Sequence, residues 1–192
     1  MHDTIRTFIA IELTKELQEE LKDLQQELKK SNIDATWVRP ENIHLTLKFL
    51  GNITTPRIEQ IGSILEDTAK QRKAFYVGLS GIGAFPKLEY PRVVWVGINE
   101  GKQETAELAK SLEDKLGEIG FQKENRPFSS HLTLARIRNP HNKDKLKKIV
   151  EGISFTSKNK AYINKIILFK STLTPQGSIY SKIYQSDFIS AV

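Results

Sequence analysis

A short motif that occurs twice is the feature of this chain that most constrains its fold. It reads Arg39-Pro40-x-x-x-His44-Leu45-Thr46-Leu47, and it returns 87 residues later as Arg126-Pro127-x-x-x-His131-Leu132-Thr133-Leu134. The two copies contain two of the four histidines of the chain. A pattern repeated at a fixed offset indicates a duplicated structural unit. We therefore predict two equivalent halves, each with one His-x-Thr strand, whose histidines meet at a common cleft.

The same offset relates the segments on either side of the motif. Each unit is predicted to contain a buried strand, an amphipathic helix, the motif strand, a second helix and a final strand. The leucines recur at spacings of three and four in the first amphipathic helix and of four in the second. The predicted ranges are 7–11, 15–30, 56–71 and 74–80 around the first motif, and 94–98, 102–117, 143–150 and 161–169 around the second. Either Thr54 or Thr55 is a suitable N-cap for the helix over 56–71.

This order of elements predicts an α+β fold. We expect a bilobal, pseudo-twofold duplicate, in which two antiparallel sheets face a central cleft and the helices lie outside. All 192 residues are expected to form one bilobal domain, with repeat units at about 5–85 and 92–170. The segment 81–91, which contains proline and glycine, is the expected crossing point between the units. A turn at Pro175-Gln176-Gly177 is expected to fold 171–188 into a C-terminal hairpin.

Composition narrows the classes of function. The absence of cysteine excludes disulfides, thiolate catalysis and cysteine-based zinc sites. No apolar run approaches the ~20 residues that cross a bilayer, and the N-terminus does not read as a secretory signal. We expect a cytoplasmic monomer with no membrane partner. The net charge of +6 suits a polyanion such as RNA, although a lysine-rich surface that keeps the protein in solution explains it equally well.

The spacing within the motif predicts what each side chain does. Side chains alternate along a strand, so His44 and Thr46 share one face and the leucines between them share the other. Core packing does not require a histidine at both equivalent positions, whereas acid–base catalysis with two imidazoles does. With a pKa of ~6.5, one imidazole can take a proton from water and the other can donate one to the leaving oxygen of a 2′,3′-cyclic phosphate. The Thr46 and Thr133 hydroxyls are candidate donors to the non-bridging oxygens. No acidic cluster lies near either motif, so neither a metal nor a cofactor is predicted.

The chain also resembles a known family over nearly its whole length. The matching segments are Arg6-Thr7-Phe8-Ile9-Ala10-Ile11, Glu41-Asn42-Ile43-His44-Leu45-Thr46-Leu47-Lys48-Phe49-Leu50-Gly51, Pro91-Arg92-Val93-Val94-Trp95-Val96-Gly97, His131-Leu132-Thr133-Leu134-Ala135-Arg136 and Lys170-Ser171-Thr172-Leu173-Thr174-Pro175-Gln176-Gly177. They resemble the RNA 2′,3′-cyclic phosphodiesterases of the 2H phosphoesterase superfamily, also called 2′-5′ RNA ligases. The resemblance implies a bilobal fold, hydrolysis that leaves a 2′-phosphomonoester and, in some members, a reversible 2′-5′ ligase activity on tRNA halves. By the same resemblance, His44 is the proton donor and His131 the proton acceptor.

Two further residues are candidate substrate ligands. Arg136 stands where the family commonly has a phosphate-binding arginine, but simple alternation places it on the face opposite His131, so it needs a bulge to reach the cleft. Lys48 shares the parity of His44, and we expect it at the rim, facing either RNA phosphate or solvent. Arg39 and Arg126 lead into the motif strands and either contact RNA or pair with carboxylates.

The alternatives that the residues leave open concern the aromatic side chains and the reaction. Phe49, Phe85, Phe128 and Trp95 are candidates for stacking on bases, although most aromatic residues in a domain of this size belong to the core. A non-catalytic RNA- or nucleotide-binding module would keep the same cleft without turnover. A phosphodiesterase acting on another small cyclic or 2′-5′ linked nucleotide would use the same two histidines.

Overall fold

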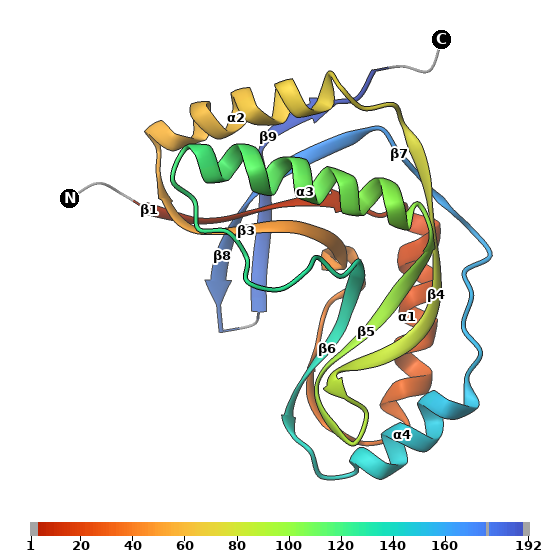
Figure 1. Ribbon diagram of the computed structural model, residues 1–192. Helices are drawn as coiled ribbons and strands as arrows, with labels where there is room; N and C mark the ends of the chain where they lie inside the picture. The colour runs from red at the N-terminus through yellow and green to blue at the C-terminus, as the bar shows by residue number, and fades with distance from the viewer. Residues whose placement is uncertain (1–3, 176, 190–192) are drawn as a thin grey trace.

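The computed structural model describes residues 4–175 and 177–189, and helices and strands alternate along most of this length (Figure 1). In chain order the elements are β1 (Thr4–Glu12), α1 (Lys15–Lys29), β2 (Asp34–Trp37), the 3-10 helix η1 (Pro40–Asn42), β3 (His44–Thr54), α2 (Pro56–Ala69), β4 (Phe75–Lys87), β5 (Tyr90–Glu100), α3 (Lys102–Glu118), β6 (His131–Asn139), α4 (Lys143–Gly152), β7 (Ala161–Ile163), β8 (Lys165–Thr174) and β9 (Gly177–Asp187). None of the described helices is long and apolar enough to cross a bilayer.

The helices form where leucine spacing predicts them. α1 buries four leucines on one face, and the Thr14 hydroxyl caps it by accepting a hydrogen bond from the backbone N–H of Leu17. Burying a leucine side chain stabilises a fold by ~1.5–3 kcal/mol, so such a face fixes the helix against the sheet. α2 begins with Pro56. Of the two threonines predicted to cap it, Thr55 occupies the N-cap position, but its side chain makes no capping hydrogen bond.

The strands form a curved antiparallel sheet in the order β7-β4-β5-β6-β3-β1-β8-β9. β2 pairs with β6 on the edge away from β5, beyond the point where β3 meets β6. Within the described residues, β3 and β6 are joined through the pair Leu45 and Leu132. The sheet therefore divides there into two lobes. The first lobe contains β3, β1, β8 and β9, and the second contains β6, β5, β4, β7 and β2. The predicted α+β, bilobal architecture is confirmed, with the two predicted sheets joined along this seam.

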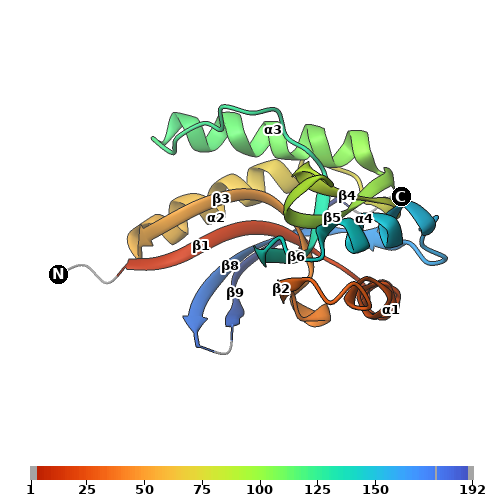
Figure 2. The same cartoon turned by 90° about the horizontal axis from the view of Figure 1, so that it is seen from below.

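The two lobes are not the two sequence repeats. β4, the last strand of the first repeat, pairs with β5 in the second lobe, and β8, from the second repeat, pairs with β1 in the first. The helices are exchanged in the same way. α3 packs beside α2 against β3, whereas α1 packs near α4 and its Gln25 amide donates to the carbonyl of Leu134 in β6. Figure 1 shows α2 and α3 over the first lobe and α1 and α4 at the second, and Figure 2 shows α3 on the far side of β3 from the β8–β9 hairpin.

Three connections differ in detail from the sequence-based expectation. The segment 81–91 joins the repeats as a tight hairpin, because β4 runs to Lys87 and β5 starts at Tyr90. The strand expected over 161–169 is two strands, since β7 pairs with β4 and β8 pairs with β1 in the other lobe. The C-terminal hairpin is present as β8 and β9, and its first strand starts at Lys165 rather than at 171. Gln176 of its turn lies outside the described residues.

Candidate active site

The two motifs meet at the seam between the lobes. Leu45 of β3 faces Leu132 of β6, and Leu132 is the residue that the repeat makes equivalent to Leu45. An antiparallel pair in which a residue faces its own equivalent has a local twofold axis through it. Because both leucines are buried, the residues on either side of them point to the opposite face of the sheet. The histidine and threonine of both motifs therefore lie on one face, which we call the histidine face.

The register also fixes how these four side chains are arranged. In an antiparallel ladder centred on Leu45 and Leu132, His44 lies across from Thr133 and His131 lies across from Thr46. The two histidines are then diagonal neighbours across the seam. All four side chains are partly exposed. The seam thus brings together the residues that alternation and the repeat predicted.

Both imidazoles are held by the same contact. Nδ1 of His44 lies 2.7 Å from the carbonyl oxygen of Asn42, and Nδ1 of His131 lies 2.7 Å from the carbonyl oxygen of Ser129. A carbonyl only accepts hydrogen bonds, so Nδ1 carries the proton and donates it in each case. This fixes the tautomer and leaves Nε2 of each ring to accept a proton when neutral or to donate one when charged.

The surroundings of the two rings differ. His44 stacks on Phe8, with ring centroids 4.7 Å apart, and meets the edge of Tyr180 at 5.2 Å. His131 makes edge contacts with Phe85 at 4.9 Å and Trp95 at 6.4 Å. Burial lowers the pKa of His44 below its ordinary value of 6.5, and the hydrogen bond to Asn42 offsets part of this by raising it. The free protein therefore favours the neutral form of His44.

A β-bulge in the first motif moves Lys48 away from the position that alternation predicts. Ile9 of β1 pairs with Lys48 and the next residue, Ala10, pairs with Thr46, so Leu47 is an extra residue in β3. Both Leu47 and Lys48 consequently turn towards α3, and Lys48 is 4% exposed. The expectation that Lys48 stands at the rim is wrong. Its ammonium group donates to the carbonyl of Gln122 at 2.7 Å and pairs with Glu113 of α3 at 2.8 Å.

The same bulge in the second motif brings Arg136 to the histidine face. Val94 of β5 pairs with Ala135 and Trp95 pairs with Thr133, so Leu134 is the extra residue. The next pair joins Arg136 to Val93, and Val93 shares a face with Trp95 because they are two residues apart. Arg136 is exposed on the same side as Thr133. The bulge that its predicted role requires is present, while phosphate binding itself stays a prediction.

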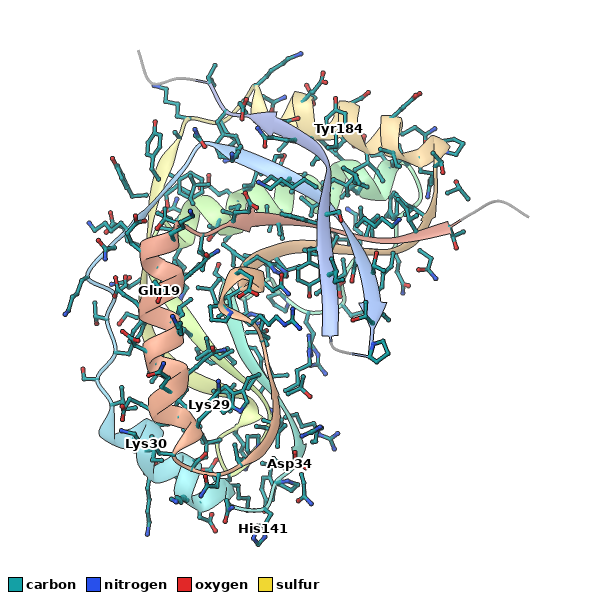
Figure 3. The ribbon with its side chains drawn as sticks, turned by 180° about the vertical axis from the view of Figure 1, so that it is seen from behind. Glu19, Lys29, Lys30, Asp34, His141 and Tyr184 are labelled. Atoms are coloured by element: carbon teal, nitrogen blue, oxygen red, sulfur yellow. The ribbon has the colours of Figure 1, made fainter. Side chains whose placement is uncertain are left out.

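The remaining candidates are distributed over the site and the core. Phe85 and Trp95 contact His131, Phe49 is exposed on the histidine face beside Thr46, and Phe128 packs against the main core. Arg39 precedes η1, and Arg126 is exposed in the loop between α3 and β6. The histidine outside the motifs that Figure 3 labels, His141, lies at the far end of the second lobe.

Sequence reasoning missed a small apolar cluster on the histidine face. It consists of Phe8, Ala10, Ile167 and Phe169, with Tyr180 packed against it. The signal was the unbroken apolar run from Phe8 to Ile11, since such a run indicates a strand covered on both faces. A cavity of about 110 Å³ lies between this cluster and η1, and His44, Asn42, Tyr180 and Lys182 line it. Across residues 4–175 and 177–189, no three potential ligands among His, Cys, Asp and Glu are grouped so that they could hold a metal ion.

The chain is similar to known proteins over most of its length. The family model described as LigT like Phosphoesterase matches residues 11–95 and again residues 96–180. The chain is 32% identical over 177 residues to the RNA 2′,3′-cyclic phosphodiesterase of Methanothermobacter thermautotrophicus, covering 92% of this chain and 95% of that protein. It is 34% identical to the protein of the same name from Thermotoga maritima, covering 96% of each.

Solved structures share the fold. A protein of Thermus thermophilus superposes with a TM-score of 0.80 at 23% identity, covering 95% of this chain and 97% of the other. Escherichia coli LigT, crystallised with 3′-AMP, superposes with a TM-score of 0.76 at 21% identity, covering 97% and 99% of the two chains. The two matches of the family model divide the chain into consecutive halves, as the sequence repeat does.

Proposed function

We propose that this chain, which belongs to the LigT-like phosphoesterase family, hydrolyses 2′,3′-cyclic phosphodiester ends of RNA to 2′-phosphomonoesters. The resemblance to the 2H phosphoesterases noted from the sequence is confirmed at the level of the family. The observation that carries the proposal is that two imidazoles at the seam are held in the same way. In each ring Nδ1 donates a hydrogen bond to the backbone carbonyl two residues earlier. Two proton-transfer groups on either side of one phosphate are what this hydrolysis needs.

The reaction then proceeds in one displacement. Neutral His131 takes a proton from water as the water oxygen attacks phosphorus. The bond between phosphorus and the ribose 3′-oxygen breaks, and protonated His44 donates its proton to that oxygen. The phosphate stays on the 2′-oxygen. The hydroxyls of Thr46 and Thr133 and the guanidinium of Arg136 donate to the non-bridging oxygens, whose negative charge grows in the transition state.

The lowered pKa of His44 is compatible with its role as the acid once substrate is bound. Burial favours the neutral ring in the free protein. A phosphodiester anion placed beside the ring favours the charged form and raises the pKa again. His44 therefore acquires its proton together with the substrate, and loses it in the displacement.

The proposal includes the finer features expected from the sequence. Every proton transfer is assigned to an imidazole, so the reaction needs neither a metal nor a cofactor. Ligation of tRNA halves through a 2′-5′ bond is the reverse displacement, with a ribose hydroxyl in place of water. We also propose that the protein acts as a monomer in the cytoplasm, and the net charge of +6 suits an RNA substrate.

Product analysis on a defined RNA end tests the proposal. An oligonucleotide that ends in a 2′,3′-cyclic phosphate is incubated with the protein in excess EDTA, and the product is separated by chromatography against 2′- and 3′-phosphate standards. We expect the 2′-phosphomonoester from the wild type, and almost none from His44→Ala or His131→Ala. A 3′-phosphomonoester, or complete loss of activity on chelation, would contradict the proposal.

A further inference from the structure

A pocket of about 300 Å³ lies next to the histidine face and has no part in the reaction proposed above. One wall is the end of β3, at residues 49–51, and the other is the loop after α3, at residues 121–125. Figure 1 shows this loop leaving α3 and passing beside β3 on its way to β6. One wall of the pocket thus follows the first motif directly and the other precedes the second motif. The pocket is larger than the cavity beside His44.

Phe49 joins this pocket to the histidine face. Its side chain is 55% exposed, and it pairs with Phe8 of β1, whereas Thr46 pairs with Ala10. Two ladder positions separate Phe49 from Thr46, a distance of about 7 Å along the same face. The Phe49 ring lies 6.2 Å from that of Phe8, which itself stacks on His44. An exposed aromatic ring thus lies close to Thr46 and His44 on the histidine face.

The loop wall of the pocket is fastened from two sides. Lys48 donates to the Gln122 carbonyl from β3, at 2.7 Å, and pairs with Glu113 of α3. The Glu113 carboxylate in turn accepts a hydrogen bond from the backbone N–H of Glu124. Lys123 pairs with Asp114 of α3 at 2.8 Å. The pocket is held in shape before any ligand arrives, which lowers the entropic cost of binding.

The repeat assigns opposite chemistry to the two ends of the histidine face. The residue equivalent to Phe49 in the second motif is Arg136, because both follow their motif histidine by five positions and lie beyond the same bulge. A guanidinium suits phosphate oxygens, whereas an exposed aromatic ring suits the flat face of a base. In the proposed reaction His44 protonates the departing ribose oxygen, so the ribose and the RNA strand attached to it lie on the side of β3.

We propose that this pocket is a subsite for the base of the nucleotide on the 5′ side of the cyclised one, with Phe49 as the stacking platform. This inference rests on the proposed function. The spacing of about 7 Å from Thr46 is of the order of the distance between neighbouring nucleotides in an unstacked strand. Gln122 and Asn125 line the pocket, and their amides both donate and accept hydrogen bonds, so the subsite accepts any of the four bases.

Substrate length tests the subsite. The value of kcat/KM is measured on adenosine 2′,3′-cyclic phosphate, on the dinucleotide that carries one further adenosine at its 5′ side, and on the same dinucleotide with an abasic 5′ nucleotide. We expect the wild type to prefer the full dinucleotide over both others. Phe49→Ala should lower the ratio of dinucleotide to mononucleotide kcat/KM by roughly 5- to 100-fold, the effect of losing one base–aromatic stack. Phe49→Trp should retain the ratio.

Two controls separate the subsite from other effects. Tyr76, at the start of β4, is 53% exposed and contacts Tyr162, so Tyr76→Ala removes an equally exposed ring and should leave the ratio unchanged. An equal loss on all three substrates in Phe49→Ala would overturn the inference, because Phe49 would then act through Phe8 on His44. An unchanged ratio would overturn it as well.

Binding measurements keep the inference separate from the proposed reaction. Calorimetric titration with the mononucleotide and dinucleotide 2′-phosphomonoesters requires no turnover. Tighter binding of the dinucleotide, lost in Phe49→Ala, supports the subsite even if the wild type fails to hydrolyse the cyclic substrates, in which case the proposed function alone fails. Equal affinities of the two compounds for the wild type would overturn the subsite even if hydrolysis is observed.

Discussion

Replacing Lys48 with methionine measures how much the buried ion pair between Lys48 and Glu113 contributes to the free energy of unfolding. Lys48 makes this pair instead of the contact with substrate that the sequence suggested. The Lys48 side chain is 3% exposed and lies 2.8 Å from Glu113, whose side chain is 21% exposed. Methionine preserves much of the volume of the lysine stem but removes the charge and the bond to the Gln122 carbonyl. Breaking a buried pair by removing one partner costs ~3–5 kcal/mol.

The expected loss is somewhat smaller here, because Glu113 retains some contact with solvent. We expect the free energy of unfolding to fall by about 2–4 kcal/mol in Lys48→Met. For a chain of this length that corresponds to a decrease in Tm of about 5–15 °C. Urea unfolding followed by tryptophan fluorescence gives the free energy, and scanning calorimetry gives the Tm.

A matched control comes from α1. Lys22 also lies 2.8 Å from its partner, Glu19, but both side chains are largely exposed, at 46% and 66%. Exposed pairs contribute at most ~1 kcal/mol, so Lys22→Met should leave the stability nearly unchanged. If Lys48→Met is as stable as Lys22→Met but raises KM for RNA, Lys48 reaches substrate in solution, and the argument from the bulge fails.

Three further predictions concern the site. Thr46→Ala and Thr133→Ala should each lower kcat by ~10²- to 10³-fold, less than either histidine replacement, in steady-state assays with folding checked by circular dichroism; complete inactivation by one of them would show that its hydroxyl does more than stabilise charge. Asn42→Ser gives the first motif the residue that the second has at the equivalent position, Ser129. The variant retains the backbone carbonyl that holds His44 but removes the hydrogen bond from the Asn42 side-chain amide to the Ser178 carbonyl of β9. It should lower kcat up to ~10-fold, whereas Ser129→Ala should leave kcat unchanged. Burial lowers the pKa of His44, so as pH decreases the unfolded chain takes up a proton at this residue before the folded protein does. The free energy of unfolding should therefore fall as pH decreases below ~6.5. His44→Gln should flatten this part of the plot of Tm against pH, and an unchanged plot would contradict the prediction.

Alternation and the repeat were sufficient to predict the centre of the site. His44 and Thr46 face away from the buried leucines because β3 is regular as far as Thr46, and the second motif repeats this geometry. Alternation fails one residue later in each motif, because a bulge inserts an extra residue and inverts the faces that follow. That single feature explains both why Lys48 is buried and how Arg136 reaches the histidine face.

The pairing of distant strands lay beyond the sequence pattern. A period of two residues identifies β4 and β8 as strands but does not say which strand each will join. The exchange of these two strands between the lobes depends on the whole fold. The same is true of Tyr180, which β9 brings against His44, and of the Asn42 amide, which donates to the Ser178 carbonyl at 3.0 Å.

The assignment of His44 as the acid and His131 as the base is the central claim, and a change of leaving atom tests it most directly. Single-turnover hydrolysis is measured on a cyclic phosphate end and on its analogue with sulfur in place of the ribose 3′-oxygen, because a thiolate leaves without needing a proton. On the oxygen substrate, His44→Ala and His131→Ala should each lose several orders of magnitude in rate. On the sulfur substrate, the account predicts that His44→Ala regains much of its rate while His131→Ala stays inactive. Recovery of His131→Ala instead would reverse the two roles, and recovery of neither would contradict the acid–base mechanism.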